Sequence, residues 1–260
     1  MSEALSISNR RKIEKKCTQI SGCHIEQIEL VDLVIDRINA RKNRREFPFL
    51  EDVLEKNIIK SLNDKTPLEF VGFWGAGEKE AVDQHDKNTL SYFKSYIENI
   101  KSVFAQEVKV TWILSDAHAK NNGYTEEKYM KYLEQIKVAL EDAGFQVIYL
   151  SQLWEKWNLK EQDIQESLEK QGQNWWSRVA IAAQLEKQAQ KRFKMNDFVF
   201  GAQKYFMMRK LEKPFLEREF KDCVFFSFND GQTQSLLPKL PSIYLYSEDR
   251  GISDVPWFNN

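Results

Sequence analysis

The hydrophobic positions of the chain follow two spacings, one typical of strands and one typical of helices. Short and nearly continuous apolar runs recur at residues 68–74, 108–116, 145–151, 223–228 and 242–247. Such runs are typical of parallel strands that helices cover on both faces, because neither face of the sheet then meets water. The pattern therefore predicts a parallel sheet of about five strands.

Longer segments, in which apolar residues lie three or four positions apart, separate these runs and predict helices. The predicted helical segments are residues 1–45, 49–62, 89–104, 126–143 and 155–193, and a last one that begins after Asp197. We expect Gly144 to cap the fourth segment at its C-terminus and Pro214 to end the last. Strands that alternate with helices are typical of α/β proteins, so the sequence predicts a Rossmann-like fold with helices on both sides of the sheet.

A chain of 260 residues is long enough for one sizeable core, and α/β domains of this size are often single. We therefore expect one domain over residues 1–260. It would consist of N-terminal helices at 1–65, a βαβαβ core at 66–151 and a helical layer at 152–195. A last helix, two late strands and a packed C-terminal tail would follow at 196–260.

The composition is that of an ordinary globular protein, with 42% hydrophobic and 30% charged residues. No apolar run reaches the roughly 18 residues of a membrane helix, and the start lacks the apolar core of a signal peptide. We therefore expect a cytoplasmic protein without a membrane partner. Cys17, Cys23 and Cys223 form neither a framework of pairs nor a zinc spacing, so we expect ordinary thiols and no metal site.

Two segments are locally basic, although the net charge of −1 excludes a protein that is basic all over. They contain Arg37, Arg41, Lys42, Arg44 and Arg45 in the first and Lys187, Lys191, Arg192 and Lys194 in the second. A solvated helix face explains either segment alone. A polyanion such as tRNA would explain why two of them occur, which makes these residues the candidate tRNA contacts.

Ligands of open parallel sheets bind where strands end and loops diverge, so we expect the active pocket at the carboxyl ends of the strands. The segment GFWGAGEKE leaves the first predicted strand, and its Gly72, Trp74 and Gly75 are candidate substrate contacts because glycine lets a ligand approach the backbone. A plain tight turn explains the same glycines. The segment matches neither GxGxxG nor a P-loop, so no nucleotide cofactor is expected.

Polar residues crowd the loop after the second predicted strand. We expect Asp116 and His118 to be catalytic, since a carboxylate can bind a substrate amine and an imidazole can move a proton near neutral pH. Asn122 and Tyr124 follow as candidate substrate contacts. The alternative is structural, with Asp116 capping the loop and His118 at the surface.

Tyr205, Arg209 and Glu212 fall on one face of the last long predicted helix, because they are four and three residues apart. An intrahelical ion pair on an exposed face is one explanation of this spacing. In the other, the three side chains face the sheet, where Tyr205 and Glu212 are catalytic and Arg209 binds the substrate. The spacing alone leaves both explanations open.

In the order of these segments, the chain resembles the tRNA-dependent cyclodipeptide synthases over about residues 66–247. The resemblance rests on VGFWGAG, ILSDAH and a late tyrosine followed by Glu212-Lys213-Pro214. It implies a fold like the catalytic domain of class I aminoacyl-tRNA synthetases, with aminoacyl-tRNA and a small amino-acid substrate as partners. A cyclic dipeptide would form by aminolysis without a metal or a nucleotide cofactor. Glu212 would bind the amino group of the aminoacyl substrate, with Tyr205 nearby.

The chain departs from that family at two places. The family's tyrosine lies four residues before the glutamate, where this chain has Met208. Its nucleophilic serine is missing, since the loop here reads Trp74-Gly75-Ala76-Gly77. A covalent aminoacyl-serine at that place is therefore excluded, which fits better with the divergent branch that builds arginine-containing cyclic dipeptides.

The chain also resembles, more weakly, the isocyanide synthases of the dityrosine and pyoverdine type. Ser115-Asp116 at a strand end and Pro256-Trp257 after a late strand are similar, whereas Phe258 replaces the terminal histidine of that family. This resemblance implies an enzyme that acts on a free amino acid and a sugar phosphate.

A sugar phosphate would need an anion site, for which Lys79, Arg250 and a helix N-terminus are the candidates. A further alternative, from another class, is a binding module without enzymatic activity. Its polar loops would then be structural.

Overall fold

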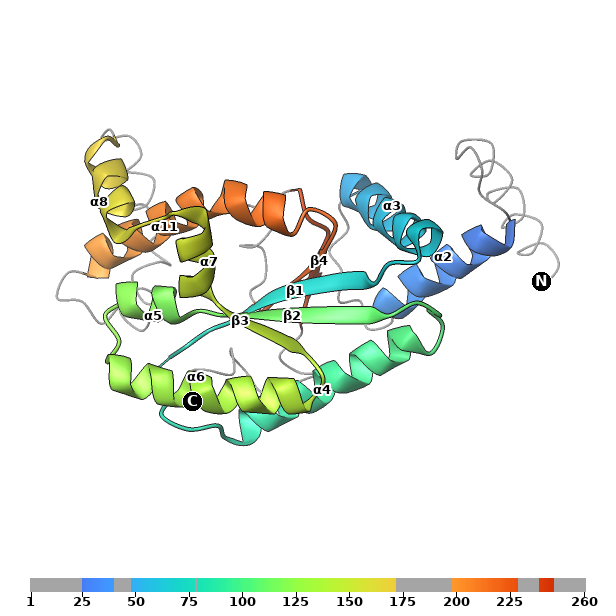
Figure 1. Ribbon diagram of the computed structural model, residues 1–260, viewed down its shortest axis with the longest axis horizontal. Coiled ribbons are helices and arrows are strands. Elements are labelled where there is room, and N and C mark those ends of the chain that lie inside the picture. The colour runs from blue at the N-terminus through green and yellow to red at the C-terminus, as the bar shows by residue number, and fades with distance from the viewer. Residues whose placement is uncertain (1–24, 40–47, 78, 172–197, 229–238, 246–260) are drawn as a thin grey trace.

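The computed structural model describes residues 25–39, 48–77, 79–171, 198–228 and 239–245 (Figure 1). Within these ranges, five parallel strands form one sheet. They are β1 (Leu68–Trp74), β2 (Val108–Leu114), β3 (Gln146–Tyr149), β4 (Val224–Ser227) and β5 (Ser242–Tyr244), in the order β3-β2-β1-β4-β5. The predicted parallel sheet of about five strands is confirmed, with β1 at its centre.

Helices cover both faces of this sheet. The described helices are α2 (Ile25–Ile38), α3 (Pro48–Asp64), α4 (Gln84–Lys101), α5 (Asp116–Asn121), α6 (Glu126–Asp142), α7 (Leu150–Trp157), α8 (Glu161–Glu169) and α11 (Phe198–Glu219). Helices α4 and α6 lie along one face, and α7 and α11 lie along the other (Figure 1). This is the layered α/β architecture that the alternation of strands and helices predicts.

Each face of the sheet has its own hydrophobic core, because successive side chains of a strand point to opposite faces. Phe70 and Trp74 of β1 pack with Trp112 of β2 on the face covered by α4 and α6. Val71 of β1 and Ile113 of β2 pack with α7, α8 and α11 on the other face. The central strand β1 therefore contributes side chains to both cores.

Gly72 lies inside β1 and not beyond its end. A Cβ atom at this position would lie 2.7 Å from Cζ3 of Trp112 and 3.0 Å from Cβ of Phe226. The glycine thus makes room for the indole of the neighbouring strand, and core packing accounts for it without a ligand. Trp74 is also part of β1, and 0% of its surface is exposed.

Helix α11 continues through Pro214 to Glu219, so the prediction that Pro214 ends this helix is wrong. Proline cannot donate a backbone hydrogen bond and normally breaks the interior of a helix. Leu216, which follows it, is 1% exposed and packs in the core over the sheet. Burial of this last turn outweighs the local preference for a break.

Two boundaries also differ from the predictions. A short helix, α5, occupies the segment after β2 where a loop was predicted, and β3 ends at Tyr149 because α7 begins at Leu150. The glycine after α6 is as expected, since Gly144 has a φ of 84°, which glycine adopts without strain.

The predicted division of one domain over residues 1–260 stays a prediction. The N-terminal part with Cys17 and Cys23, much of the helical layer and the C-terminal tail lie outside the described residues. Among the helices that the structure describes, none has both the length and the apolar character needed to cross a membrane.

Candidate active site

Three of the predicted site residues meet at the carboxyl edge of the sheet, around the side chain of Glu212, which is 0% exposed. Nε2 of His118 lies 2.9 Å from Oε1 of Glu212, and Nη1 of Arg209 donates to Oε2 at 2.9 Å. Nε1 of Trp154 donates to Oε1 at 2.8 Å. We refer to His118, Trp154, Arg209 and Glu212 as the Glu212 cluster.

Separate elements bring the Glu212 cluster together. Arg209 and Glu212 are three residues apart on one face of α11. His118 comes from α5, which begins directly after β2, and Trp154 comes from α7, which begins directly after β3. The cluster therefore forms only when the ends of two strands and α11 are in place.

The electrostatic surroundings keep Glu212 ionised. Burial alone would raise the pKa of this carboxyl, but the charges and hydrogen bonds of His118 and Arg209, with the indole of Trp154, lower it below its ordinary value. A carboxylate that accepts several hydrogen bonds is stabilised in its charged form. Glu212 is therefore a buried negative charge that its three donors hold in place.

The arrangement bears on both explanations of the Tyr205, Arg209 and Glu212 spacing. The ion pair between Arg209 and Glu212 exists, but it is buried and faces the sheet, so an exposed helix face is wrong. Both oxygens of Glu212 already accept hydrogen bonds from protein groups. A substrate ammonium would have to displace one of these donors, and a role of Glu212 in binding it stays a prediction.

Aromatic rings enclose the imidazole of His118. The ring of Phe73 stacks on it with 5.6 Å between centroids, and the ring of Tyr205 meets it edge-on at 5.6 Å. The guanidinium of Arg209 lies 4.5 Å from the centre of the Phe73 ring, a cation–π contact. His118 is 6% exposed, so the alternative that placed it at the surface is wrong.

Trp154 and Phe73 were not among the predicted site residues. Phe73 could have been found, because the period of two along β1 puts it on the same face as Val71, toward α11. Trp154 gave no such signal, since a tryptophan in a polar helical stretch is typical of a core anchor. Only the fold brings its indole N–H to Glu212.

Asp116 lies beside the Glu212 cluster without joining it. Its Oδ1 accepts a hydrogen bond of 3.0 Å from the backbone N–H of Ser151, in the first turn of α7. Asp116 therefore ties the starts of α5 and α7 together, which is a capping role toward a different element than expected. The negative charge of Asp116 also acts on Tyr129 of α6. Burial, with the charges of Glu126 and Asp116, raises the pKa of Tyr129 to about 12.

The remaining predicted substrate contacts lie around α5 and the end of β1. Asn122 is buried, and among the described residues its Oδ1 has no hydrogen-bond partner. Tyr124 packs at the margin of the core covered by α4 and α6. Gly75 is buried directly after β1. Their roles toward a substrate stay predictions.

A second buried polar network fixes the loop after β1 on the other face of the sheet. Lys79, which is 3% exposed, forms ion pairs with Asp83 and Asp86. The hydroxyl of Tyr132 donates to Asp86 at 2.6 Å, and Nε1 of Trp74 donates to that hydroxyl at 3.0 Å. Two carboxylates already bind its ammonium group, so a phosphate would have to displace one of them, and the role of Lys79 as a phosphate ligand stays a prediction.

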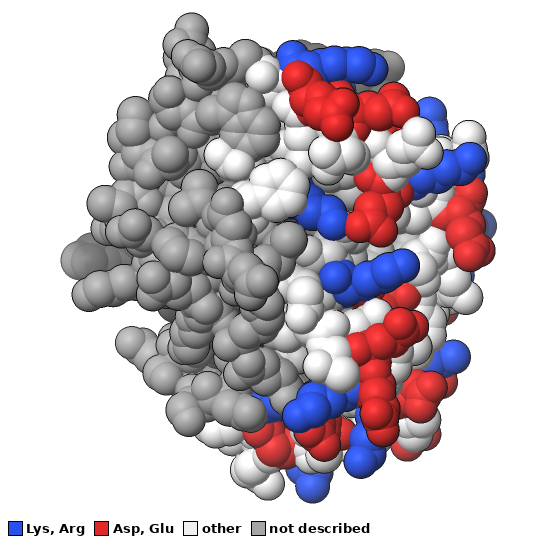
Figure 2. Space-filling view, turned by 90° about the vertical axis from the view of Figure 1, so that its left-hand side faces the viewer, with Lys and Arg blue, Asp and Glu red and all other residues white. Residues whose placement is uncertain are grey.

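Of the predicted tRNA contacts, the structure describes Arg37, which is half-buried in the last turn of α2. Arg41, Lys42, Arg44, Arg45, Lys187, Lys191, Arg192 and Lys194 lie outside the described residues. Figure 2 views the carboxyl edge, where the described acidic and basic side chains intermingle. The described part of this face is therefore not uniformly basic.

Two pockets lined by described residues lie away from the Glu212 cluster. One, of about 430 Å³, borders β3 and includes Gln146 and Ile148. The other, of about 280 Å³, lies at the amino end of β1 and includes Leu68 and Glu69. The predicted pocket at the carboxyl ends of the strands stays a prediction.

Comparisons with known proteins identify the fold. No protein family and no curated protein matches the sequence. Among solved structures, the PvcA protein from Pseudomonas aeruginosa is similar with a TM-score of 0.59 and 15% identity, over 88% of this chain and 87% of that protein. At this identity the likeness concerns the fold.

Tyrosyl-tRNA synthetase from Archaeoglobus fulgidus, complexed with L-tyrosine, is similar with a TM-score of 0.50 and 13% identity. The match covers 82% of this chain and 63% of the synthetase, so the chain spans less than two thirds of that enzyme. The five-stranded parallel sheet with flanking helices is thus the fold of class I tRNA synthetase catalytic domains, as expected.

Proposed function

We propose that the chain is an enzyme that handles aminoacyl groups and forms a cyclic dipeptide from aminoacyl-tRNA. The observation that carries the proposal is the buried pair of Glu212 and His118 at the carboxyl edge of a sheet with the class I synthetase fold. Ligands of open parallel sheets bind at this edge. The segment order shared with the cyclodipeptide synthases supports the more specific reaction.

His118 is the general base in this proposal. Glu212 accepts the hydrogen of Nε2, so in the neutral imidazole Nδ1 carries the lone pair. In the described part of the chain, Nδ1 has no hydrogen-bond partner. A carboxylate behind an imidazole fixes its tautomer and stabilises the imidazolium that forms when it takes a proton.

Two aminolysis steps would give the product. First, the amine of one aminoacyl group attacks the ester carbon of a second, the bond to the ribose oxygen breaks, and His118 passes the proton from the amine to that oxygen. The remaining amine then attacks the ester of the dipeptidyl group in the same way and closes the ring. The ester on tRNA is already activated, so positioning and proton transfer suffice.

The test uses protein expressed in bacteria, with tRNA measured in the purified protein at low salt and metabolites measured by mass spectrometry. We expect bound tRNA, a new cyclic dipeptide, and loss of the product in a lysate treated with RNase. His118→Ala should lose the product while still binding tRNA, and Lys120→Ala, an exposed neighbour on α5, should keep both. Absence of tRNA binding together with a product insensitive to RNase would exclude the proposal.

A second candidate is an isocyanide synthase that acts on a free amino acid and a sugar phosphate. It is favoured by the likeness to PvcA, an isocyanide-synthase-like fold, which covers nearly all of both chains. Lys79, one candidate for its phosphate site, is already paired with Asp83 and Asp86, so the phosphate would have to displace a carboxylate. A stoichiometric thermal shift with a sugar phosphate, independent of tRNA, would select this candidate.

The non-enzymatic alternative makes a different prediction for the same variant. If the polar groups at the carboxyl edge are structural, His118→Ala changes stability and leaves the metabolites of the expressing cells as they were. A product that disappears with His118→Ala, in a folded protein, excludes a binding module.

A further inference from the structure

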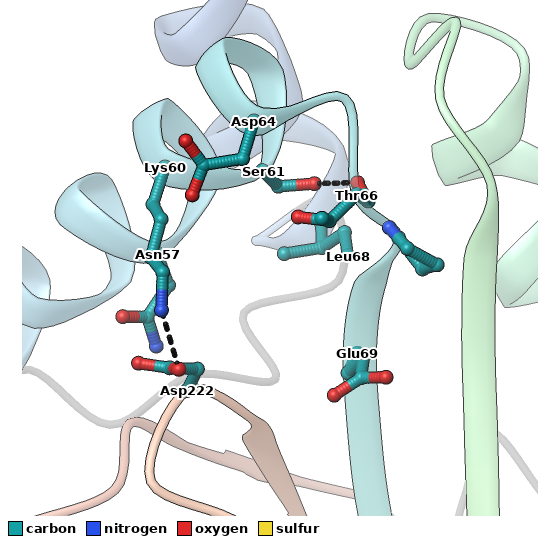
Figure 3. A pocket seen from close by; sticks show the side chains of 9 residues that line it. Asn57, Lys60, Ser61, Asp64, Thr66, Leu68, Glu69 and Asp222 are labelled. Atoms are coloured by element: carbon teal, nitrogen blue, oxygen red, sulfur yellow. Dashed lines mark hydrogen bonds and ion pairs between the residues drawn. The ribbon is translucent and has the colours of Figure 1, made fainter.

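A pocket at the amino edge of the sheet, opposite the Glu212 cluster, has the chemistry of a binding site. It lies between the second half of α3, the start of β1 and the turn before β4, with a volume of about 280 Å³ (Figure 3). Asn57 and Lys60 reach from α3 toward Asp222, and Glu69 of β1 stands on the opposite wall. We refer to this site as the α3 pocket.

The α3 pocket is negatively charged. Asp64, Glu69 and Asp222 line it, against one lysine, Lys60, whose Nζ lies 2.6 Å from Asp222. The hydrogen bond and charge of Asp222, with the charges of Asp64 and Glu69, raise the pKa of Lys60. All three carboxylates therefore act on the same small volume, and an excess of negative charge remains after Lys60 is paired.

The thiol of Cys223 responds to the same charges. It is buried beside the α3 pocket and donates to Oε2 of Glu69 at 3.8 Å. Burial raises the pKa of this thiol, and the charges of Glu69 and Asp222 raise it further. A neutral thiol can donate to Glu69 but does not neutralise its charge.

A buried polar group points independently to a ligand. Asn57 is 9% exposed, and in the part of the chain that the structure describes its Nδ2 has no hydrogen-bond partner. Figure 3 shows its amide on the wall of the α3 pocket, beside the pair of Lys60 and Asp222. Buried amide donors are almost always satisfied, so this one calls for an acceptor oxygen inside the pocket.

A metal ion fits these groups poorly. Among the described residues, no three acidic, histidine or cysteine side chains converge closely enough to hold one. The carboxylates instead stand on different walls of a space that is smaller than the 300 to 1,000 Å³, roughly, of drug-sized ligands. Such spacing suits a small organic cation.

We propose that the α3 pocket binds a small organic cation that carries oxygen acceptors beside its ammonium group, as aminated sugars do. The ammonium group would lie between Glu69 and Asp64, and an oxygen of the ligand would accept from Nδ2 of Asn57. This site is distinct from the Glu212 cluster, since the two lie at opposite ends of β1.

The experiment titrates the full chain, labelled with ¹⁵N, with three probes at pH 6 and low salt. Glucosamine has both the cation and the oxygens, glucose has only the oxygens, and putrescine has only the cations. We expect saturable binding of glucosamine, weaker binding of putrescine and none of glucose. The shifted amide signals should be those of the end of α3, the start of β1 and Asp222. Equal binding of glucose and glucosamine, or shifts confined to the carboxyl edge, would refute the proposal.

Variants separate the two features of the pocket. Glu69→Gln should lower the affinity for glucosamine by roughly three- to tenfold, because the exposed charge pair between Glu69 and the ligand's ammonium group is lost. Asn57→Ala should abolish the preference for glucosamine over putrescine. Thermal unfolding followed by circular dichroism checks that this variant is folded. Asp142→Asn, at an exposed carboxylate at the end of α6, serves as the matched control. If it weakens binding as much as Glu69→Gln, the cation senses only net charge and the site is disproved. None of these outcomes depends on tRNA.

Discussion

A buried carboxylate remains charged only while its donors stay in place, and its removal leaves those donors without a partner. In Glu212→Gln, the guanidinium of Arg209 would remain buried beside a neutral amide. Breaking a buried ion pair on one side destabilises proteins by about 3 to 5 kcal/mol. We expect urea unfolding to show a loss of about 3 kcal/mol, in addition to any loss of activity.

The control for this substitution is Glu166→Gln on α8, which removes an exposed partner of Lys170. Exposed pairs of this kind contribute at most about 1 kcal/mol. A Glu212→Gln protein as stable as the wild type would mean that the Glu212 cluster is not held as described.

The lowered pKa of Glu212 predicts how stability depends on pH. Its ordinary value is 4.5, and the folded state holds the proton less tightly than the unfolded state does. The ionised form therefore stabilises the fold fully above that value, and the stabilisation is lost as the pH falls through the folded pKa. The difference in unfolding free energy between the wild type and Glu212→Gln should shrink when measured from pH 7 down to pH 3, whereas a constant difference would contradict the assignment.

The sequence could predict which residues of the site carry suitable functional groups, but not which partners they bind in the fold. Tyr205, Arg209 and Glu212 follow from helical spacing, and His118 follows from its place after a strand. The indole of Trp154 could not be assigned, since its partner lies 58 residues away. The burial of Lys79 could not be predicted from the sequence either, because Tyr132 and Trp74, which complete its network, come from separate elements.

Helix α11 contains a proline that its packing tolerates. Pro214 is exposed and lies inside the helix, where it cannot donate to the carbonyl four residues earlier. Replacing an interior proline by alanine restores that hydrogen bond and favours the helix by up to about 3 kcal/mol. We expect Pro214→Ala to raise the unfolding free energy by about 1 to 2 kcal/mol, since the unfolded chain also gains freedom.

The comparison for Pro214→Ala is Lys210→Ala, one turn earlier at an exposed position of the same helix. Both changes improve or keep helix propensity, but only the first adds a backbone hydrogen bond. Equal stabilities of the two variants would indicate that the backbone at Pro214 is not strained.

The strands were easier to predict than the ends of the helices. β1 and β2 have continuous apolar runs because both faces of the sheet are covered, and this pattern is specific. The end of α11 depends instead on the packing of Leu216 against the sheet, and the local sequence around Pro214 does not reveal this contact. The same holds for Gly72, whose reason for being glycine is Trp112, a residue of another strand.

At the scale of the molecule, the net charge of −1 offers no general attraction for tRNA, so any such attraction must be local. We predict that Arg44→Glu with Arg45→Glu lowers tRNA affinity and flattens its dependence on salt, because each lost phosphate contact removes about one unit of slope. Filter binding from low to moderate salt measures both. Lys94→Glu, exposed on α4, is the control, and an equal effect of the two changes would exclude a local tRNA site.

The central place of β1 in the sheet affects how the protein can fold while the ribosome synthesises it. Val71 pairs with Thr111 on one side and with Phe225 on the other. These two partners lie 114 residues apart in the sequence, so at synthesis rates of about 5 to 20 residues per second the second emerges roughly 6 to 23 seconds after the first. During that interval, β1 is an open hydrogen-bonding edge in the middle of the future sheet, and such edges attract other chains. The nascent chain is therefore most exposed to pairing with other chains in the interval before β4 emerges.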